Sequence, residues 1–145
     1  MKICISILCF FLILKANAQS FELGKVSKSE LEEKVHPTDT SAAAAFIFKK
    51  AKTYFKYTQK NGFESITEYS IKLKIYKKDG FKWANFEIPY YVGYENLNDE
   101  MVSISKAFTY NLEKGKIIKE KVSSEGKFKE KMNEFWETKI ITFPN

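Results

Sequence analysis

The stretch "EYSIKLKIYKKDG", Glu68 to Gly80, decides the fold class of this chain. Its side chains alternate, so that one face of the predicted strand carries Tyr69, Ile71, Leu73 and Ile75 and the other carries Ser70, Lys72, Lys74 and Tyr76. A period of two is typical of a strand with one buried and one solvated face. We therefore expect Ile71 and Leu73 in the core and Lys72 and Lys74 in solvent. The pair Asp79-Gly80 predicts a tight turn that ends the strand.

Turn signals on both sides of this stretch mark further strands. Asn61-Gly62 predicts a hairpin turn, and the residues before it alternate between Ala51, Thr53, Phe55 and Tyr57 on one face and Lys50, Lys52, Tyr54 and Lys56 on the other. The later segments are a strand at Phe81–Tyr94, a hairpin at Ser103–Ser123 that turns at Glu113–Lys116, a charged stretch at Ser123–Glu134 with a short helical turn, and a last strand at Phe135–Phe143. Pro89 indicates an edge strand or a bulge.

A single helix is expected, close to the N-terminus. The segment Ser27–Val35 begins with a Ser27-x-x-Glu30 capping box, and His36-Pro37 ends the helix. The sequence thus predicts an all-β, mainly antiparallel fold, a β-sandwich or open barrel with one short N-terminal helix. The expected organisation is a signal peptide at 1–18, a tether and short helix at 19–41, and the N-terminal part of a β-sandwich domain at 42–145.

The first eighteen residues have the pattern of a secretory signal. Lys2 precedes an apolar run from Ile3 to Leu14, and "ANA" (16–18) offers small residues for cleavage after Ala18. The run is too short for a membrane span, which needs about 20 residues. We therefore expect an exported, periplasmic or envelope-associated protein that does not span the membrane after cleavage. Cys4 and Cys9 would leave with the signal, so the mature chain would have no thiol.

The charge of the chain gives little support to nucleic-acid binding. The formal net charge is +6, from 24 lysines and 18 acidic residues, and the sequence contains no arginine. Arginine supplies the planar, bidentate donor that reads phosphates and guanine edges, whereas lysine is a point charge. We expect no nucleic-acid partner.

The sequence contains no catalytic constellation that stands above chance. His36 is the one histidine, in a turn beside a proline, so a surface or packing role is expected. The pattern Ser-x-x-Lys of penicillin-binding enzymes occurs at Ser103/Lys106 and Ser124/Lys127, about as often as chance predicts. Carboxylate pairs such as Glu64 with Glu87 are not distinguished from solvated strand residues. We therefore expect no enzymatic activity, and no catalytic, cofactor-binding or metal-binding residues.

One cluster has the character of a binding surface. Trp83, Tyr90, Tyr91 and Tyr94 lie close together in the sequence, and exposed aromatic rings can stack on sugars or hold a peptide. Burial of the same rings in an aromatic-rich core is the competing interpretation.

Several segments together resemble a known family. They are "LGKVSKSELEEKVHPTDTSAAAA" (23–45), "WANFEIPYY" (83–91), "FTYNLEKGKIIKEKVS" (108–123) and "EFWETKIITFPN" (134–145). In these segments the chain resembles the N-terminal domain, domain of unknown function 3857, of exported bacterial transglutaminase-like proteins. The resemblance covers nearly all of the chain after the signal.

The resemblance implies a non-catalytic role. In such proteins the matching "FPN" is followed by further strands and then by a transglutaminase-like, papain-like domain, so this chain looks like an N-terminal piece whose last strand has an unpaired edge. The implied function is a β-domain that positions or shields the downstream domain, which would be its partner. The alternative is a stand-alone exported module that binds an envelope glycan or peptide through a Tyr/Trp surface.

Overall fold

The computed structural model describes residues 22–93 and 99–144, and the predicted signal at 1–18 lies outside them. The elements are α2 (Lys28–Glu32), β1 (Ala44–Thr58), β2 (Gly62–Ile75), the 3-10 helix η1 (Lys78–Ala84), β3 (Asn85–Tyr91), β4 (Phe108–Glu113), β5 (Lys116–Lys121), β6 (Lys127–Lys131) and β7 (Trp136–Thr142). Every strand pairing is antiparallel. The prediction of an all-β, antiparallel fold with one short α-helix is confirmed.

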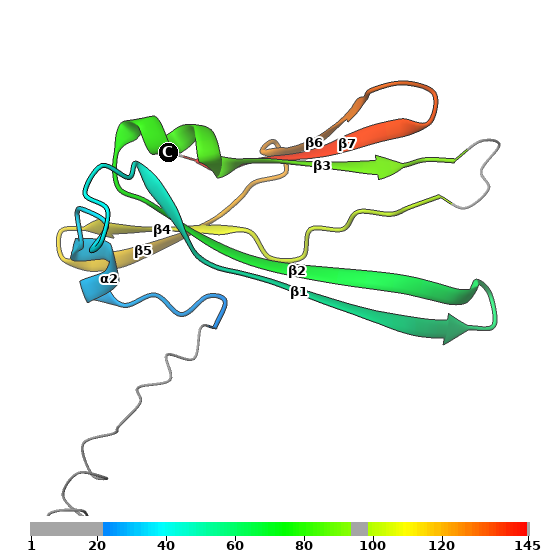
Figure 1. Ribbon diagram of the computed structural model, residues 1–145, viewed down its shortest axis with the longest axis horizontal. Helices are drawn as coiled ribbons and strands as arrows, with labels where there is room; N and C mark the ends of the chain where they lie inside the picture. Colours follow the sequence, from blue (N-terminus) through cyan, green and yellow to red (C-terminus); the bar gives the residue numbers. More distant parts are fainter. Residues whose placement is uncertain (1–21, 94–98, 145) are drawn as a thin grey trace, which may run out of the picture.

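The strands form three small sheets in an open, two-layered arrangement. The sheet β3-β7-β6 lies on one side, and the hairpins β1-β2 and β4-β5 lie on the other (Figure 1). Between them the core of the described residues is small. It consists of Ala107, Val122 and Ile141, against which Phe86, Ile104 and Phe143 pack.

The hairpin β1-β2 is the longest element, and its outer half extends away from the other strands (Figure 1). Gly62 closes its turn with φ of +71°, a conformation that favours glycine. The register shifts between Phe46 and Phe48, which marks a bulge close to the body. We refer to the outer half, residues 51–69, as the arm.

The sequence pattern predicts that Lys72 and Lys74 of β2 are exposed to solvent, and the structure shows that this prediction is wrong. Lys74 is only 9% exposed, and Lys72 is also largely covered. The helix α2 lies over this face, with Glu30 paired to Lys72 and Glu33 paired to Lys74. The opposite residue, Leu73, is half-buried, because the core between the layers is thin.

The capping of α2 differs in part from its sequence signature. The Ser27 hydroxyl accepts from Glu30 N at 3.1 Å, as the capping box predicts. The Glu30 carboxylate, however, binds Lys72 Nζ at 2.7 Å instead of returning to the backbone of Ser27. The ion pair across to β2 therefore replaces the second half of the box.

Two other segments also differ from the prediction. Phe81–Ala84 belongs to η1, so the strand that was expected from Phe81 begins at Asn85. The cause lies at Gly80, where a Cβ atom would be 2.3 Å from the carbonyl oxygen of Ala43, so the chain passes there tightly between layers. The charged stretch expected to hold a helical turn contains the strand β6, which pairs with β7.

Of the remaining predictions, three agree with the structure and one does not. Pro89 lies in β3, an edge strand, and the hairpin β4-β5 turns at Lys114-Gly115, both with positive φ. The strand β7 matches the predicted last strand. An unpaired edge was expected at this strand, and that is wrong, because β7 is hydrogen-bonded to β3 on one side and to β6 on the other.

Candidate binding surfaces

The structure separates the four aromatic residues that the sequence grouped together. Trp83 lies in η1, at one end of β3, and Tyr90 and Tyr91 lie at the other end of that strand. Because Tyr90 and Tyr91 are neighbours in a strand, their side chains point to opposite faces. Tyr94 lies outside the described residues. The predicted cluster is therefore not one surface.

Tyr91 instead contacts Trp136, which was not among the residues predicted from the sequence. It pairs across the sheet with Trp136, and their ring centroids are 5.6 Å apart at an interplanar angle of 67°. The Glu100 carboxylate accepts from Tyr91 N at 2.8 Å, and Glu100 N donates to Tyr91 O at 2.7 Å. This reciprocal bonding fixes the chain that follows Asp99 against the end of β3.

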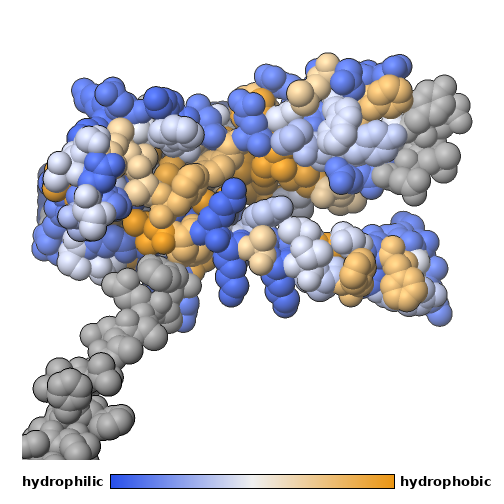
Figure 2. Space-filling view, in the orientation of Figure 1, coloured by the Kyte–Doolittle hydropathy of each residue, from blue (hydrophilic) through white to orange (hydrophobic). Residues whose placement is uncertain are grey.

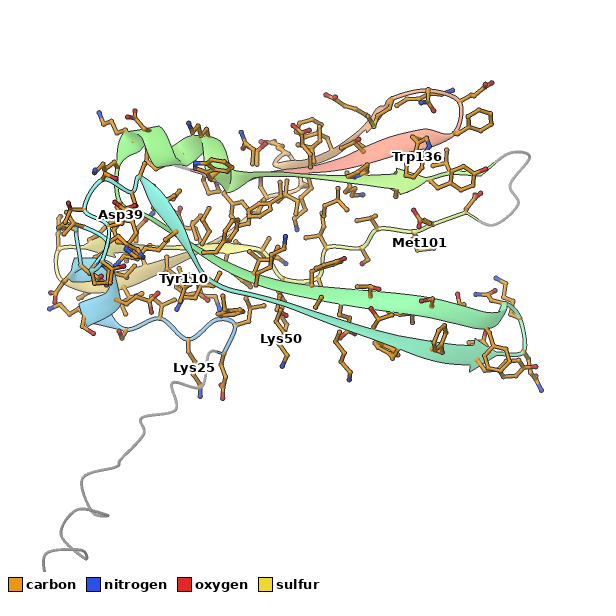
Figure 3. The ribbon with its side chains drawn as sticks, viewed as in Figure 1. Lys25, Asp39, Lys50, Met101, Tyr110 and Trp136 are labelled. Atoms are coloured by element: carbon orange, nitrogen blue, oxygen red, sulfur yellow. The ribbon has the colours of Figure 1, made fainter. Side chains whose placement is uncertain are left out.

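The same end of the sheet carries two exposed methionines. Met101 follows Glu100 and is 92% exposed, and Met132, whose backbone N donates to Trp136 O at 2.9 Å, is 62% exposed. Figure 3 shows Trp136 and Met101 at this end of the molecule. We define the sheet-end patch as Tyr91, Met101, Met132 and Trp136. Since methionines scattered in loops have no periodicity, no sequence pattern indicated this patch.

A charged network lies on the other face of the sheet, around Tyr90. Its hydroxyl donates to Glu137 Oε2, and Lys129 Nζ lies 3.0 Å from the same oxygen. These two donors lower the pKa of the Glu137 carboxyl, and the bond to Glu137 raises the pKa of both Tyr90 and Lys129. The Tyr90 side chain is thus held beside a carboxylate whose ionised form is favoured.

The arm presents a second surface, which has no charge. One of its faces consists of four cross-strand pairs, Tyr57–Phe63, Phe55–Ser65, Thr53–Thr67 and Ala51–Tyr69. All of these residues are exposed, Phe55 by 76% and Phe63 by 80%. The rings of Tyr57 and Phe63 lie 5.1 Å apart, and the hydroxyls of Thr53 and Thr67 are 2.9 Å apart. We refer to these residues as the uncharged arm face.

The opposite face of the arm is charged. It carries Lys52, Lys56, Glu64 and Glu68, and Lys50 lies on the same face immediately before the arm. The space-filling view shows apolar residues exposed at the end of the arm, and open space between the arm and the β3-β7-β6 sheet (Figure 2). The sequence showed the alternation of these residues, but not that the uncharged face is exposed beyond the body while Tyr54 and Ile66 on the charged face are half-buried.

The residues with catalytic potential make structural contacts. His36 Nδ1 accepts from Asp39 N at 3.1 Å, and the ring meets Tyr76 edge-on with centroids 5.7 Å apart. His36 therefore closes a turn, which confirms the packing role expected for it.

The second Ser-x-x-Lys match borders a shallow hollow. Ser124 and Lys127 help to line this hollow, which has a volume of about 470 Å³. The backbone N of Lys127 donates to Ser124 O at 3.1 Å, which is a turn contact. Within residues 22–93 and 99–144, no hydrogen bond joins the Ser124 hydroxyl to the Lys127 amine.

Glu64 and Glu87 are not brought together, since Glu64 lies in β2 near the arm turn and Glu87 lies in β3. Among the described residues, no three His, Cys, Asp or Glu side chains gather in a way that could hold a metal ion. No helix in the described part of the chain has the length and apolar character that crossing a membrane requires.

Comparisons of the chain with protein-family models, with curated proteins and with solved structures gave no match.

Proposed function

We propose that this chain is a non-catalytic β-module that binds another polypeptide and positions it. The observation that carries the proposal is the sheet-end patch, where large apolar side chains are exposed at a fixed position on a hydrogen-bonded sheet. Tyr, Trp and Met are the residues in which protein–protein interfaces are enriched. Methionine side chains are flexible and adapt to a partner surface.

One charged residue borders the patch. Glu100 lies beside it and accepts from Tyr91 N, whereas the charges of Lys129 and Glu137 lie on the other face of the sheet. A polar rim around an aromatic centre keeps water away from the contact. Such a rim also fixes orientation, which is what a positioning module needs.

The sheet edges are less suited to binding than the patch. Pro89 lies in the outer strand β3 and has no N–H to donate, and β6 carries three lysines in five residues. Proline and lysine at edges oppose the addition of a strand from another chain. The partner is therefore expected to contact side chains at the end of the sheet, and not to extend its ladder.

The resemblance to exported transglutaminase-like proteins suggests the identity of the partner. In this proposal it is a transglutaminase-like, papain-like domain outside the cytoplasm, and the module positions or shields it. Mass spectrometry of the purified N-terminus tests the location, with Gln19 as the expected first residue. An intact Met1 on a cytoplasmic species would contradict export.

A binding experiment tests the proposal. The chain is mixed with a separately purified transglutaminase-like domain of an exported bacterial protein, and the complex is followed by calorimetry and size-exclusion chromatography. We expect a complex that Trp136→Asp weakens by at least about tenfold, because the variant buries an unpaired carboxylate. Trp83→Asp is the control, since Trp83 is similarly exposed but lies at the other end of β3.

The alternative is a stand-alone module that binds an envelope glycan. The specific observation in its favour is the edge-on Tyr91–Trp136 pair, whose Trp136 ring is exposed, because flat rings can stack on sugars. Retention on an insoluble polysaccharide that is lost in Trp136→Ala, with no complex in the mixing experiment, would favour this function and overturn the first.

A further inference from the structure

The uncharged arm face is too exposed to be explained by the fold alone. The arm is a two-stranded hairpin, and an isolated hairpin is at best marginally stable in water. The larger rings on the face, Phe55, Tyr57, Phe63 and Tyr69, are each more than three-fifths exposed. The same face of β2 carries Ile71 and Leu73 where the hairpin enters the body, and these two side chains are half-buried, so the apolar face loses its cover only along the arm.

We propose that the uncharged arm face is a dimer interface, and that its occupant is the same face of a second copy of this chain. The area is sufficient. Four aromatic side chains that bury about 200 Å² each when covered, at their present exposure, offer on the order of 550 Å² per copy. Two facing arms thus bury about 1,100 Å², which reaches the ~1,000 Å² that a specific interface requires.

The charge distribution favours this occupant. A chain with a net charge of +6 repels its own copies, and a contact between them needs a surface without lysine. The uncharged arm face is such a surface, since it ends at Lys49 on the body side and at Lys60 in the turn. An acidic partner would instead be attracted to the opposite face, which carries Lys50, Lys52 and Lys56.

The shape of the face sets the orientation of the two copies. The body is thicker than the arm, so two arms can stack only with the tip of each over the base of the other (Figure 1). In this antiparallel arrangement Tyr57 covers Ala51 of the second copy, and Phe55 covers Thr53. On β1 large side chains thus meet small ones, as packed sheets require, and on β2 Phe63 faces Tyr69 as an aromatic pair.

Sedimentation velocity over a range of protein concentrations tests the dimer. We expect a monomer–dimer equilibrium in the micromolar range that added salt strengthens, because salt screens the repulsion between like-charged chains. Phe55→Glu raises the dissociation constant at least about tenfold. Phe128→Glu is the matched control and leaves it unchanged, since Phe128 is exposed on β6, away from the arm. Circular dichroism confirms that both variants fold.

A second pair of variants tests the antiparallel arrangement. Ala51→Trp places a bulky ring opposite Tyr57 and weakens the dimer, and adding Tyr57→Ala restores it. A chain that stays monomeric at every concentration, or that dimerises equally well with Phe55→Glu, would overturn the proposal. Failure of Tyr57→Ala to restore association would overturn the orientation. A monomer whose retention on insoluble cellulose is lost with Phe55→Glu would assign the face to a neutral glycan and overturn the dimer.

The outcome is independent of the proposed function. The sheet-end patch and the arm are separate surfaces, and Trp136→Asp is not expected to change the monomer–dimer equilibrium.

Discussion

Lys74 is a charged residue whose side chain is almost fully covered by the fold. Its amine lies 3.0 Å from the Glu33 carboxylate and 4.7 Å from the centre of the Tyr76 ring, and its side chain is 9% exposed. Burial of the lysine stem along apolar surface, with the charge satisfied at its end, contributes packing as well as charge. The lysine therefore has a structural role.

Replacement of Lys74 is expected to destabilise the fold. Lys74→Ala removes the packed stem and leaves Glu33 unpaired, for a loss of about 1–2 kcal/mol in the free energy of unfolding. Lys74→Met keeps the stem and should lose less. Lys56→Ala, at an exposed position of the arm, should change it by less than about 0.5 kcal/mol. Urea denaturation measures all three, and equal losses for Lys74→Ala and Lys56→Ala would contradict the assigned role.

Substitution of either of two glycines is expected to destabilise the fold, for a different physical reason at each position. At Gly80 an added Cβ atom would meet the backbone oxygen of Ala43 at 2.3 Å, so Gly80→Ala requires the backbone to move and should cost about 1–3 kcal/mol. Gly62 has open space around it but a φ of +71°, so Gly62→Ala should cost only about 1 kcal/mol. Gly62→Asn should recover part of the loss at Gly62, because asparagine tolerates this conformation. Thermal melts distinguish the two; a smaller loss at Gly80 than at Gly62 would contradict the close packing on Ala43.

The network around Tyr90 gives a pH prediction. Glu137 has a lowered pKa, so its contribution to folding is present above the ordinary glutamate range and is lost as pH falls through the lowered value. Tyr90 and Lys129 have raised pKa values, so their contributions are lost as pH rises through those values. Glu137→Gln should return the pKa of Tyr90 toward that of an exposed tyrosine. Ultraviolet titration of the variant, with Tyr90→Phe as the reference, measures the change, and an unaltered tyrosine titration would contradict the network.

At the scale of the elements, ion pairs join the helical segment to β2. The helix contains no buried residue; Glu30 pairs with Lys72, and the C-cap residue Glu33 pairs with Lys74. A helix of one turn cannot persist alone, and α2 also contacts β4. Its position on β2 therefore depends in part on the two pairs.

A charge exchange tests this dependence. Lys72→Glu places like charges together and should detach the segment before β1, which becomes a site of proteolysis. The double variant Lys72→Glu with Glu30→Lys should restore protection, because the pair is reformed with reversed polarity. The quantity measured is the extent of cleavage between α2 and β1 by a protease at limiting concentration. Equal cleavage of the single and double variants would show that the pair does not hold the helix.

The elements that could be predicted from the sequence are those whose local residue pattern agrees with their place in the fold. The strands β2 and β4 alternate clearly, and the β1-β2 and β4-β5 turns contain an Asn-Gly and a Lys-Gly pair, so the short-range signals were sufficient. The strand β6, "KFKEK", has no such signal, and its pairing with β7 decides its conformation. The site residues were less predictable. Tyr91 was identified, but its partner Trp136 comes from a distant segment that the pairing of β3 with β7 brings close, and Met101 is placed by the bonds between Glu100 and Tyr91.

At the scale of the whole molecule, the described core is small and most large apolar residues are partly exposed. Local stability should therefore vary strongly along the chain. The strand β7 is hydrogen-bonded on both sides and contains Ile141 of the core, whereas the arm has one ladder and two open edges.

Hydrogen exchange is expected to follow this gradient. At low protein concentration the amides of β7 should exchange most slowly and those of the arm tip, Thr53 to Thr67, most rapidly, because opening the tip exposes almost no additional apolar surface. The exposed edges of β1 and β2 leave the outward-facing amides of the arm in solvent in either state, so only the amides bonded across the hairpin report on opening. A rise in protein concentration should slow exchange at those cross-hairpin amides and leave β7 unchanged, since covering the uncharged arm face stabilises the hairpin without altering the core. Mass spectrometry of peptides from the two regions reads both effects. Uniform protection of arm and β7 at low concentration would mean that the arm is stabilised by contacts within one chain, and its exposed face would then need no second copy to cover it.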